Sequence, residues 1–297
     1  MSEPRSRWTG KILIAILWIL SIVAAVFIFS TIVQPFLASL FAPKLVSQDW
    51  SGYAAFSDSQ NPQPLVTGVS ASWTVPQVAS SRGDSYSAAW IGIGGYVGDP
   101  TLIQVGTEQD SQNGLPKYSA WYELLVGNVV RISTISLSAG DEINASINLI
   151  DSNSSIWTIE ITDVTTGQTF EHDFQYASSR LSADYIVERP TVNGFVSTLA
   201  DFGKITFTNS AVNMSAASEP IRSFPYTQIV MYDSRGIALV SVSPIGSDGS
   251  TFTVTYLTAA TTTQSILTGA YALAPLNPQA TVQPSLTQKK RFNTLTQ

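Results

Sequence analysis

Residues 140–167 have the sequence GDEINASINLIDSNSSIWTIEITDVTTG, and this stretch decides the fold class. It holds two runs rich in β-branched and aromatic residues, at 142–150 and 156–164. The turn dipeptides Gly140-Asp141 and Thr166-Gly167 bound the two runs. Short runs of this composition between turn signals are typical of β-strands.

The same pattern continues on both sides of this stretch, from about residue 47 to residue 257. No window in this region shows a sustained helical period, so an all-β domain is expected. Many short strands indicate a two-sheet antiparallel β-sandwich or a barrel, and we favour the sandwich. The expected strands are 68–75, 88–93, 118–124, 129–137, 142–150, 156–164, 185–188, 204–208, 228–232, 238–242 and 251–257.

The N-terminal region has the pattern of a membrane anchor. Arg5, Arg7 and Lys11 precede an uncharged apolar run at residues 12–33. At about 1.5 Å per residue this run would span ~33 Å, enough for a transmembrane helix. The basic flank predicts a cytoplasmic N-terminus at 1–11 and places the following domain outside the cytoplasm, attached to the cell membrane. A cleaved signal peptide is the alternative, but the run is longer than a typical signal sequence, so an uncleaved anchor is favoured.

The rest of the chain divides by composition. We expect a linker at 34–46, the β-sandwich at 47–258, and a disordered tail rich in Thr, Pro and Gln at 259–297. Between residues 42 and 265 the chain carries 20 acidic and 9 basic residues. The exported domain is therefore strongly acidic.

The composition excludes several classes of function. The 297 residues include no Cys and one His, with 15 basic against 21 acidic residues. Cysteine nucleophiles, thiolate metal sites and disulfides are excluded, and a serine triad would need His172. No spacing typical of metal ligands is found, and the negative charge argues against nucleic acid as a partner. Acid–base chemistry would fall to carboxylates, or less readily to Lys or Tyr.

Three expected strands carry polar residues beside apolar ones on the same face. On spacing alone, each is more typical of an ordinary surface or core-edge position. His172 is expected to face solvent at the end of a strand, without a catalytic role. The polar candidates are Gln104 between Leu102 and Gly106, Asp184 and Glu188 on either side of Ile186, and Glu123 and Ser119 on either side of Trp121.

Seven segments in order, between residues 50 and 203, resemble the motifs of one family. They are WSG at 50–52, WTVP at 73–76, WIGIGG at 90–95, IQVG at 103–106, AWYE at 120–123, ADYIVE at 183–188 and ADFG at 200–203. This ordered set resembles the eqolisins, the glutamic peptidase family. The chain departs from the family pattern at Gly94 and Ser119, where Asp is usual, and at Glu108 and Asp184, which replace Asp and Glu.

The resemblance implies a concanavalin-like sandwich of two antiparallel sheets and an acid-acting endopeptidase without metal or cofactor. It implies that Gln104 and Glu188 form the catalytic dyad, with Trp50, Trp90, Trp121, Glu123 and Asp184 binding substrate or supporting the dyad. Polypeptide substrates, membrane contact through the N-terminal helix and a monomeric state are expected.

The implied roles are chemically consistent. A Glu188 carboxylate would take a proton from the attacking water and return it to the leaving amine. Gln104 would orient the water and stabilise the oxyanion without changing charge. A Glu base has a reference pKa of ~4.3, so it works in acid.

Two functions from other classes stay open. One is a membrane-anchored β-sandwich that binds or adheres and has a degenerate site. The other is a glycoside hydrolase that uses two carboxylates, Glu123 and Glu188.

Overall fold

The chain forms two compact units, Met1–Ala42 and Pro43–Gln297. The computed structural model describes residues 5–29, 44–57, 64–214 and 218–258. The expected tail at 259–297 and most of the expected linker at 34–46 lie outside the described residues.

The first unit contains one described helix, α1 (Arg5–Ile28). It overlaps the anchor expected at 12–33, of which residues 30–33 lie outside the described part. Among the described residues, no helix combines the length and apolar character needed to cross a membrane. The predicted transmembrane anchor is therefore not supported.

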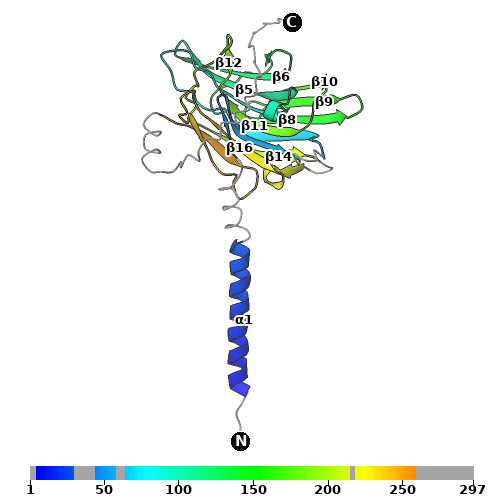
Figure 1. Cartoon of the computed structure of the whole chain (residues 1–297), viewed down its shortest axis with the longest axis vertical. Coiled ribbons are helices and arrows are strands. Elements are labelled where there is room, and N and C mark those ends of the chain that lie inside the picture. The colour runs from blue at the N-terminus through cyan, green and yellow to red at the C-terminus, as the bar shows by residue number, and fades with distance from the viewer. Residues whose placement is uncertain (1–4, 30–43, 58–63, 215–217, 259–297) are drawn as a thin grey trace. The chain divides into compact units, whose positions relative to one another are not determined.

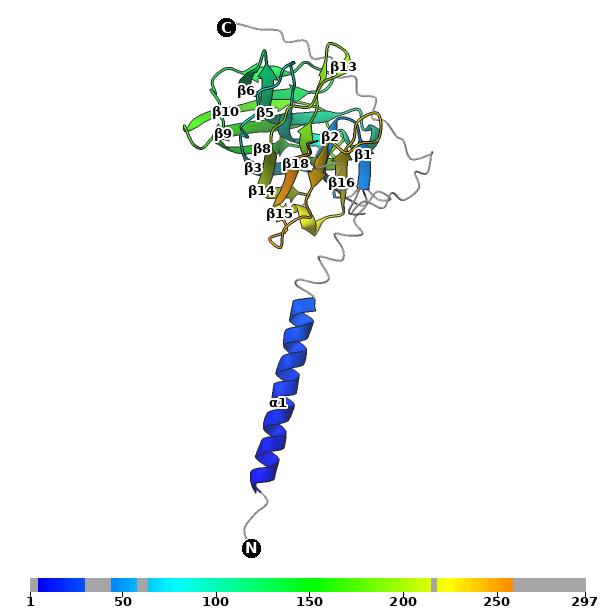
Figure 2. The same cartoon turned by 90° about the vertical axis from the view of Figure 1, so that its left-hand side faces the viewer.

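The described residues of the second unit form two eight-stranded sheets and one two-stranded sheet. Figures 1 and 2 show the two large sheets in two layers, with β9 and β10 at one side of the domain and β1 and β16 at the other. In spatial order, sheet A consists of β1 (Lys44–Ser47), β16 (Tyr226–Met231), β2 (Trp50–Phe56), β11 (Ser182–Glu188), β4 (Ala88–Gly94), β5 (Leu102–Gln112), β6 (Leu115–Leu124) and β7 (Val130–Ile132). Sheet B consists of β10 (Gln168–Gln175), β9 (Ile156–Asp163), β8 (Glu142–Asp151), β3 (Gly68–Thr74), β14 (Lys204–Asn213), β18 (Phe252–Tyr256) and β17 (Val240–Val242), with β15 (Ser218–Pro220) paired to β14.

Short elements complete the domain. β12 (Thr191–Val192) and β13 (Phe195–Val196) form the small sheet. Two single-turn 3-10 helices, η2 (Tyr96–Gly98) and η3 (Ile221–Ser223), follow β4 and β15.

The pattern of buried and exposed residues along each strand matches the place of the strand in its sheet. β9 alternates half-buried and buried residues, because one of its faces packs inward and the other faces out. β4 and β11 are buried along their whole length. Because the residues of β4 and β11 are buried on both faces, the outward side chains of these two strands are also shielded from solvent.

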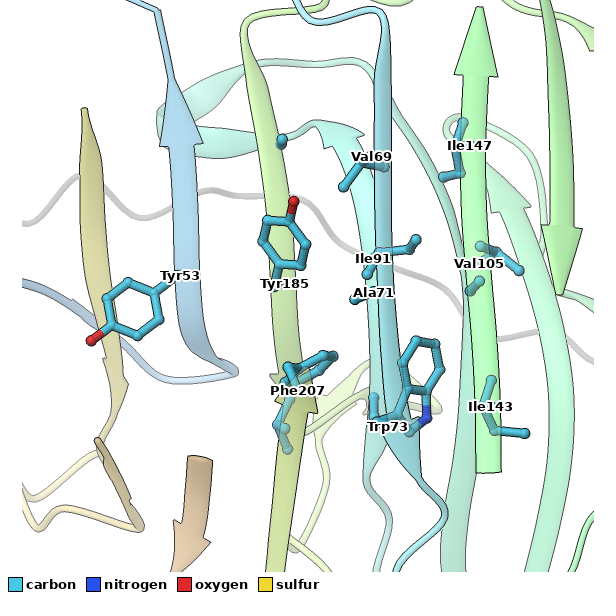
Figure 3. Close-up of a cluster of buried hydrophobic side chains, with 14 of the residues drawn as sticks. Tyr53, Val69, Ala71, Trp73, Ile91, Val105, Ile143, Ile147, Tyr185 and Phe207 are labelled. Atoms are coloured by element: carbon cyan, nitrogen blue, oxygen red, sulfur yellow. The ribbon is translucent and has the colours of Figure 1, made fainter. Parts of the chain in front are cut away.

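The main core lies between the two sheets. Ile91, Val105 and Tyr185 of sheet A pack in one buried cluster with Val69, Trp73 and Ile147 of sheet B. Figure 3 shows these inward side chains along the facing strands. Burial of this apolar surface, at about 25 cal/mol per Å², stabilises the sandwich and fixes which face of each sheet points out.

The sandwich was predicted correctly, with corrections at its edges. The expected strand at 129–137 contains only β7, Val130–Ile132, and β1, Lys44–Ser47, was not among the expected strands. β1 and β16 pair in parallel, so sheet A is not wholly antiparallel. A parallel pair needs a long connection, which the chain between Ser47 and Tyr226 provides.

Candidate active site

The outer face of sheet A, which we call the site face, carries a second buried cluster separate from the main core. Its apolar members are Trp50, Ala54, Ala88, Trp90, Leu102, Trp121, Ile186 and Ile229, with Leu45, Tyr96, Leu125 and Val129 packed against them. Every candidate site residue is buried among them or beside them: Gln104, Asp184, Glu188 and Glu123 are all at most 4% exposed. Buried polar groups on an apolar surface are costly unless they are hydrogen-bonded, so each needs a partner.

Strand register arranges these residues in three rows across β2, β11, β4, β5 and β6, in that order. The first row is Trp50, Glu188, Ala88, Glu108 and Ser119. The second row is Gly52, Ile186, Trp90, Gly106 and Trp121. The third row is Ala54, Asp184, Gly92, Gln104 and Glu123. All seven sequence-predicted site residues therefore lie on one face.

Glu188 ends β11 in the first row and is held by an indole. Trp90 Nε1 donates to Glu188 Oε2 over 2.8 Å. The ring of Trp50 packs edge-on against Trp90, with 5.0 Å between the ring centroids. A hydrogen bond from an N–H group favours the ionised carboxylate, the form a general base requires.

Gln104 lies in the third row and is held by the neighbouring strand. Its Nε2 donates to Glu123 Oε2 over 2.7 Å. A carboxylate only accepts, so this contact fixes which end of the amide faces Glu123. Gln104 Oε1 is buried and has no partner among the described residues. The amide therefore keeps one acceptor and one further N–H for another molecule.

The two members of the predicted dyad do not touch each other. Gln104 is two strands from Glu188, with β4 and its Trp90 between them. They also differ by two rows, since Glu188 pairs with Ala88 and Gln104 with Gly92. Anything that uses both side chains must extend across Trp90, as a bound peptide with its attacking water would.

Glu123 and Glu188 are further apart, with two strands between them. At the usual strand spacing of about 4.8 Å, three steps correspond to ~14 Å across the sheet. The carboxyl groups of glycosidases lie roughly 5–9.5 Å apart. This arrangement does not favour the glycoside hydrolase alternative.

Asp184 lies across Gly92 from Gln104 and is fully buried. Burial raises the pKa of Asp184 well above its usual value, the hydrogen bond from Ser182 lowers it, and the charge of Asp99 raises it further. Ser182 Oγ donates to Asp184 Oδ2 over 3.1 Å, while Oδ1 has no partner among the described residues. The carboxyl group is therefore poised to carry a proton.

The structure adds Glu108 to the site face, a residue that sequence reasoning treated only as a departure from the family. It lies in the first row, with only the small side chain of Ala88 between it and Glu188. Ser119 Oγ donates to Glu108 Oε2 over 3.1 Å. The alternation of Gln104, Gly106 and Glu108 along β5 could have identified it.

Other features lie away from the site face. His172 is exposed in the middle of β10 in sheet B, beside the ring of Phe174, and not at a strand end as expected. A cavity of about 470 Å³ is lined by residues such as Pro76 and Lys204 and by none of the candidate site residues. In the described part of the chain, no three His, Cys, Asp or Glu side chains are grouped to hold a metal ion.

Known proteins resemble this chain in sequence. It is 28% identical to Aspergillopepsin-2 of Aspergillus niger over 234 residues, which cover 71% of this chain and 78% of the relative. It is 29% identical to Scytalidopepsin B of Scytalidium lignicola over 174 residues, which cover 55% of this chain and 65% of the relative.

The fold resembles solved structures of the same kind. Scytalido-glutamic peptidase with a transition state analog inhibitor matches with a TM-score of 0.59 and 22% identity, over 71% of this chain and 98% of that one. Aspergilloglutamic peptidase from Aspergillus niger matches with a TM-score of 0.53 and 26% identity, over 58% of this chain and 99% of that one.

A family model describes most of the second unit. The model of the Peptidase A4 family matches residues 48–264, which include all three rows of the site face. With the relatives above, this match confirms the resemblance that the seven motifs indicated. The chain belongs to the Peptidase A4 family, the glutamic peptidases, and is an endopeptidase.

Proposed function

We propose that this protein hydrolyses peptide bonds in acid, with Glu188 as general base and Gln104 as the group that orients water and stabilises the oxyanion. The observation that carries the proposal is that each side chain is buried on the site face and fixed by one neighbour. Trp90 holds Glu188 and Glu123 holds Gln104. Fixed donors and acceptors in a water-poor site are what acyl-transfer catalysis needs.

The proposed reaction proceeds in two steps. In the first, Glu188 accepts a proton from water while the water oxygen bonds to the carbonyl carbon, and the carbonyl π electrons move to its oxygen. The second N–H of Gln104 donates to this oxyanion, and Oε1 accepts from the water. In the second step the carbonyl re-forms, the C–N bond breaks, and the proton on Glu188 passes to the leaving nitrogen. The products are a carboxylic acid and an amine.

Supporting roles follow from the contacts. Trp90 would hold the carboxylate of Glu188 in a fixed position. Glu123 would hold the amide of Gln104 in one orientation. Trp50 would position Trp90, and Asp184 would remain protonated beside Gln104.

The test is an assay of the full-length chain with a denatured protein as substrate between pH 2 and 7. We expect new N-termini in the products and the highest activity in acid. Gln104→Ala should lower kcat about 10²–10³-fold, the usual cost of losing an oxyanion donor. Gln175→Ala, an exposed glutamine on β10, is the matched control and should keep full activity.

Two outcomes would contradict the proposal. No cleavage by a well-folded chain at any pH would favour the non-catalytic binding module. Release of sugars from a polysaccharide, dependent on Glu123 but not on Gln104, would favour a glycoside hydrolase.

The location of the domain is a separate proposal that rests on sequence alone. Arg5, Arg7 and Lys11 ahead of the apolar run favour an N-terminus in the cytoplasm and a domain outside it. Protease added to intact cells should then degrade the domain. Protection of the domain in intact cells and degradation only after lysis would contradict export.

A further inference from the structure

Buried polar atoms without a partner gather on the site face. Within the described residues, six buried side-chain nitrogen or oxygen atoms have no hydrogen-bond partner. Three of the six belong to the second and third rows of the site face: Gln104 Oε1, Trp121 Nε1 and Asp184 Oδ1. Most buried polar atoms in folded proteins have partners, so such a cluster indicates groups that the chain itself does not supply.

Trp121 Nε1 is the one nitrogen donor among these three atoms. Other buried indoles of the domain use their N–H groups within the fold. Trp73 donates to Thr107, Trp90 to Glu188 and Trp157 to the carbonyl oxygen of Tyr176. An indole nitrogen only donates, so Trp121 needs an acceptor that is absent from its surroundings.

The position of Trp121 brings this donor to the strand next to Gln104 on the site face. Trp121 and Trp90 share the second row, on either side of Gly106. A Cβ atom at Gly106 would lie 2.3 Å from Ala89 O and 2.5 Å from the Cβ of Trp90, so this position must be glycine. Within this row, the position between the two indoles therefore carries no side chain. Trp121 is also on the strand of Glu123, two residues from the carboxylate that holds Gln104.

We propose that Trp121 is a catalytic residue whose indole N–H donates to the scissile carbonyl oxygen as it becomes an oxyanion, as a second donor beside Gln104. This inference rests on the proposed function and deepens it. The hydrogen bond strengthens as the water oxygen bonds to carbon and the π electrons move to oxygen. It weakens again when the carbonyl re-forms and the C–N bond breaks. Trp121 keeps its own proton throughout.

The donor type suits an acid-acting site. One amide N–H of Gln104 is already used by Glu123, which leaves a single N–H of that residue for the oxyanion. The indole N–H does not titrate between pH 2 and 7, so it donates equally well across the working range. Two fixed neutral donors on one oxygen form an oxyanion hole.

The test replaces Trp121 in the full-length chain by benzothienylalanine, which keeps the ring shape and puts sulfur in place of the N–H group. The matched control is the same replacement at Trp157, whose N–H has a partner at 2.9 Å in the core. Trp121→Phe is a second variant, made without an unnatural residue. For each protein, kcat, KM and the midpoint of thermal unfolding are measured.

We expect the Trp121 analogue to lower kcat by about 100-fold, to leave KM within twofold, and to leave the unfolding midpoint unchanged or higher. Stability should not fall because the lost N–H had no partner in the fold. The Trp157 analogue should show the reverse, a lower midpoint and an unchanged kcat.

Three results would overturn the inference. An unchanged kcat would mean that the N–H meets only water. A raised KM with unchanged kcat would mean that it binds a carbonyl away from the reacting bond. A lower kcat that tracks a lower unfolding midpoint in both Trp121 variants would mean a structural role. Absence of activity in the unmodified chain would instead overturn the proposed function itself.

Discussion

At the residue scale, contacts between side chains could not be predicted from the sequence even where the residues could. Alternation and motif order indicated Gln104, Glu188, Glu123 and Trp121 as candidates. The pairing of Gln104 with Glu123 depends on the register of β5 against β6. Alternation fixes which face each side chain occupies but not the register, because a shift of two residues keeps every side chain on its face.

Asp184 gives a prediction for the dependence of stability on pH. Burial raises the pKa of its carboxyl group above the unfolded value of about 3.9. Between the pKa of the unfolded state and that of the folded state, the folded chain binds a proton that the unfolded chain releases. The free energy of unfolding should therefore fall as pH rises between these two pKa values, by up to about 1.4 kcal/mol per pH unit. Asp184→Asn should flatten this fall. Chemical unfolding at pH 3 to 7 would measure it.

A second carboxyl group provides a control of opposite sign. Partial burial raises the pKa of Asp248, but hydrogen bonds from Thr251 and Ser250 outweigh this and lower it to about 2. Its contribution is present above about pH 4 and is lost as pH falls toward 2. Asp248→Asn should therefore lower stability above about pH 4 and reduce the change in stability between pH 4 and 2, without altering how stability varies with pH in the neutral range. If Asp184→Asn and Asp248→Asn changed the free energy of unfolding equally at neutral pH, the opposite directions of the two pKa shifts would be contradicted.

At the element scale, most strands rich in β-branched and aromatic residues were predicted, whereas β2 and β10 were absent from the expected set. β2 has the sequence WSGYAAF, rich in Gly and Ala, which favour strands weakly. It forms because β11 and β16 pair with it on both sides. β-Propensity reflects such packing more than the backbone itself, so tertiary context decides this element.

Gly52 tests the close packing of β2 against β11. Its φ is 138°, and a Cβ atom there would lie 2.0 Å from the carbonyl oxygen of Tyr185. Gly52→Ala should therefore push the two strands apart and lower the free energy of unfolding by about 3 kcal/mol. Because β11 ends in Glu188, activity should fall as well.

The matched control for this prediction is Gly83→Ala. Gly83 has no atom within 4 Å of a Cβ position, so an added methyl group meets nothing. Its free energy of unfolding should change by less than about 0.5 kcal/mol. If both variants are equally stable in urea titrations, the close approach of β2 and β11 does not constrain position 52.

At the scale of the whole molecule, the strand order could not be predicted from local patterns. β2 lies between β16 and β11, which are more than a hundred residues away along the chain. Alternation indicates that a segment is a strand and which face is buried, but not its neighbours. The run of short strands favoured the sandwich and the family resemblance implied the same fold, but neither gave the order of the strands.

The charge of the domain predicts how salt acts on stability. From residue 42 to residue 265, 20 acidic residues oppose 9 basic ones. Like charges repel in the compact state, and salt screens them over about 10 Å at 0.1 M. Added salt should therefore raise the unfolding midpoint at pH 7 and have less effect at pH 4, where carboxylates begin to protonate. Thermal unfolding with and without 0.3 M NaCl at the two pH values would measure this, and an equal effect at both would contradict it.

The measurement that tests the central claim most directly is kcat/KM for the full-length chain with Glu188→Gln, between pH 2 and 7. The control is Glu171→Gln, which removes an exposed carboxylate from β10 in sheet B. If Glu188 is the general base, its replacement should lower kcat/KM by about 10²–10⁴-fold at every pH where the native chain is active, while the control keeps full activity. Undiminished cleavage by a folded Glu188→Gln chain would show that another group activates the water.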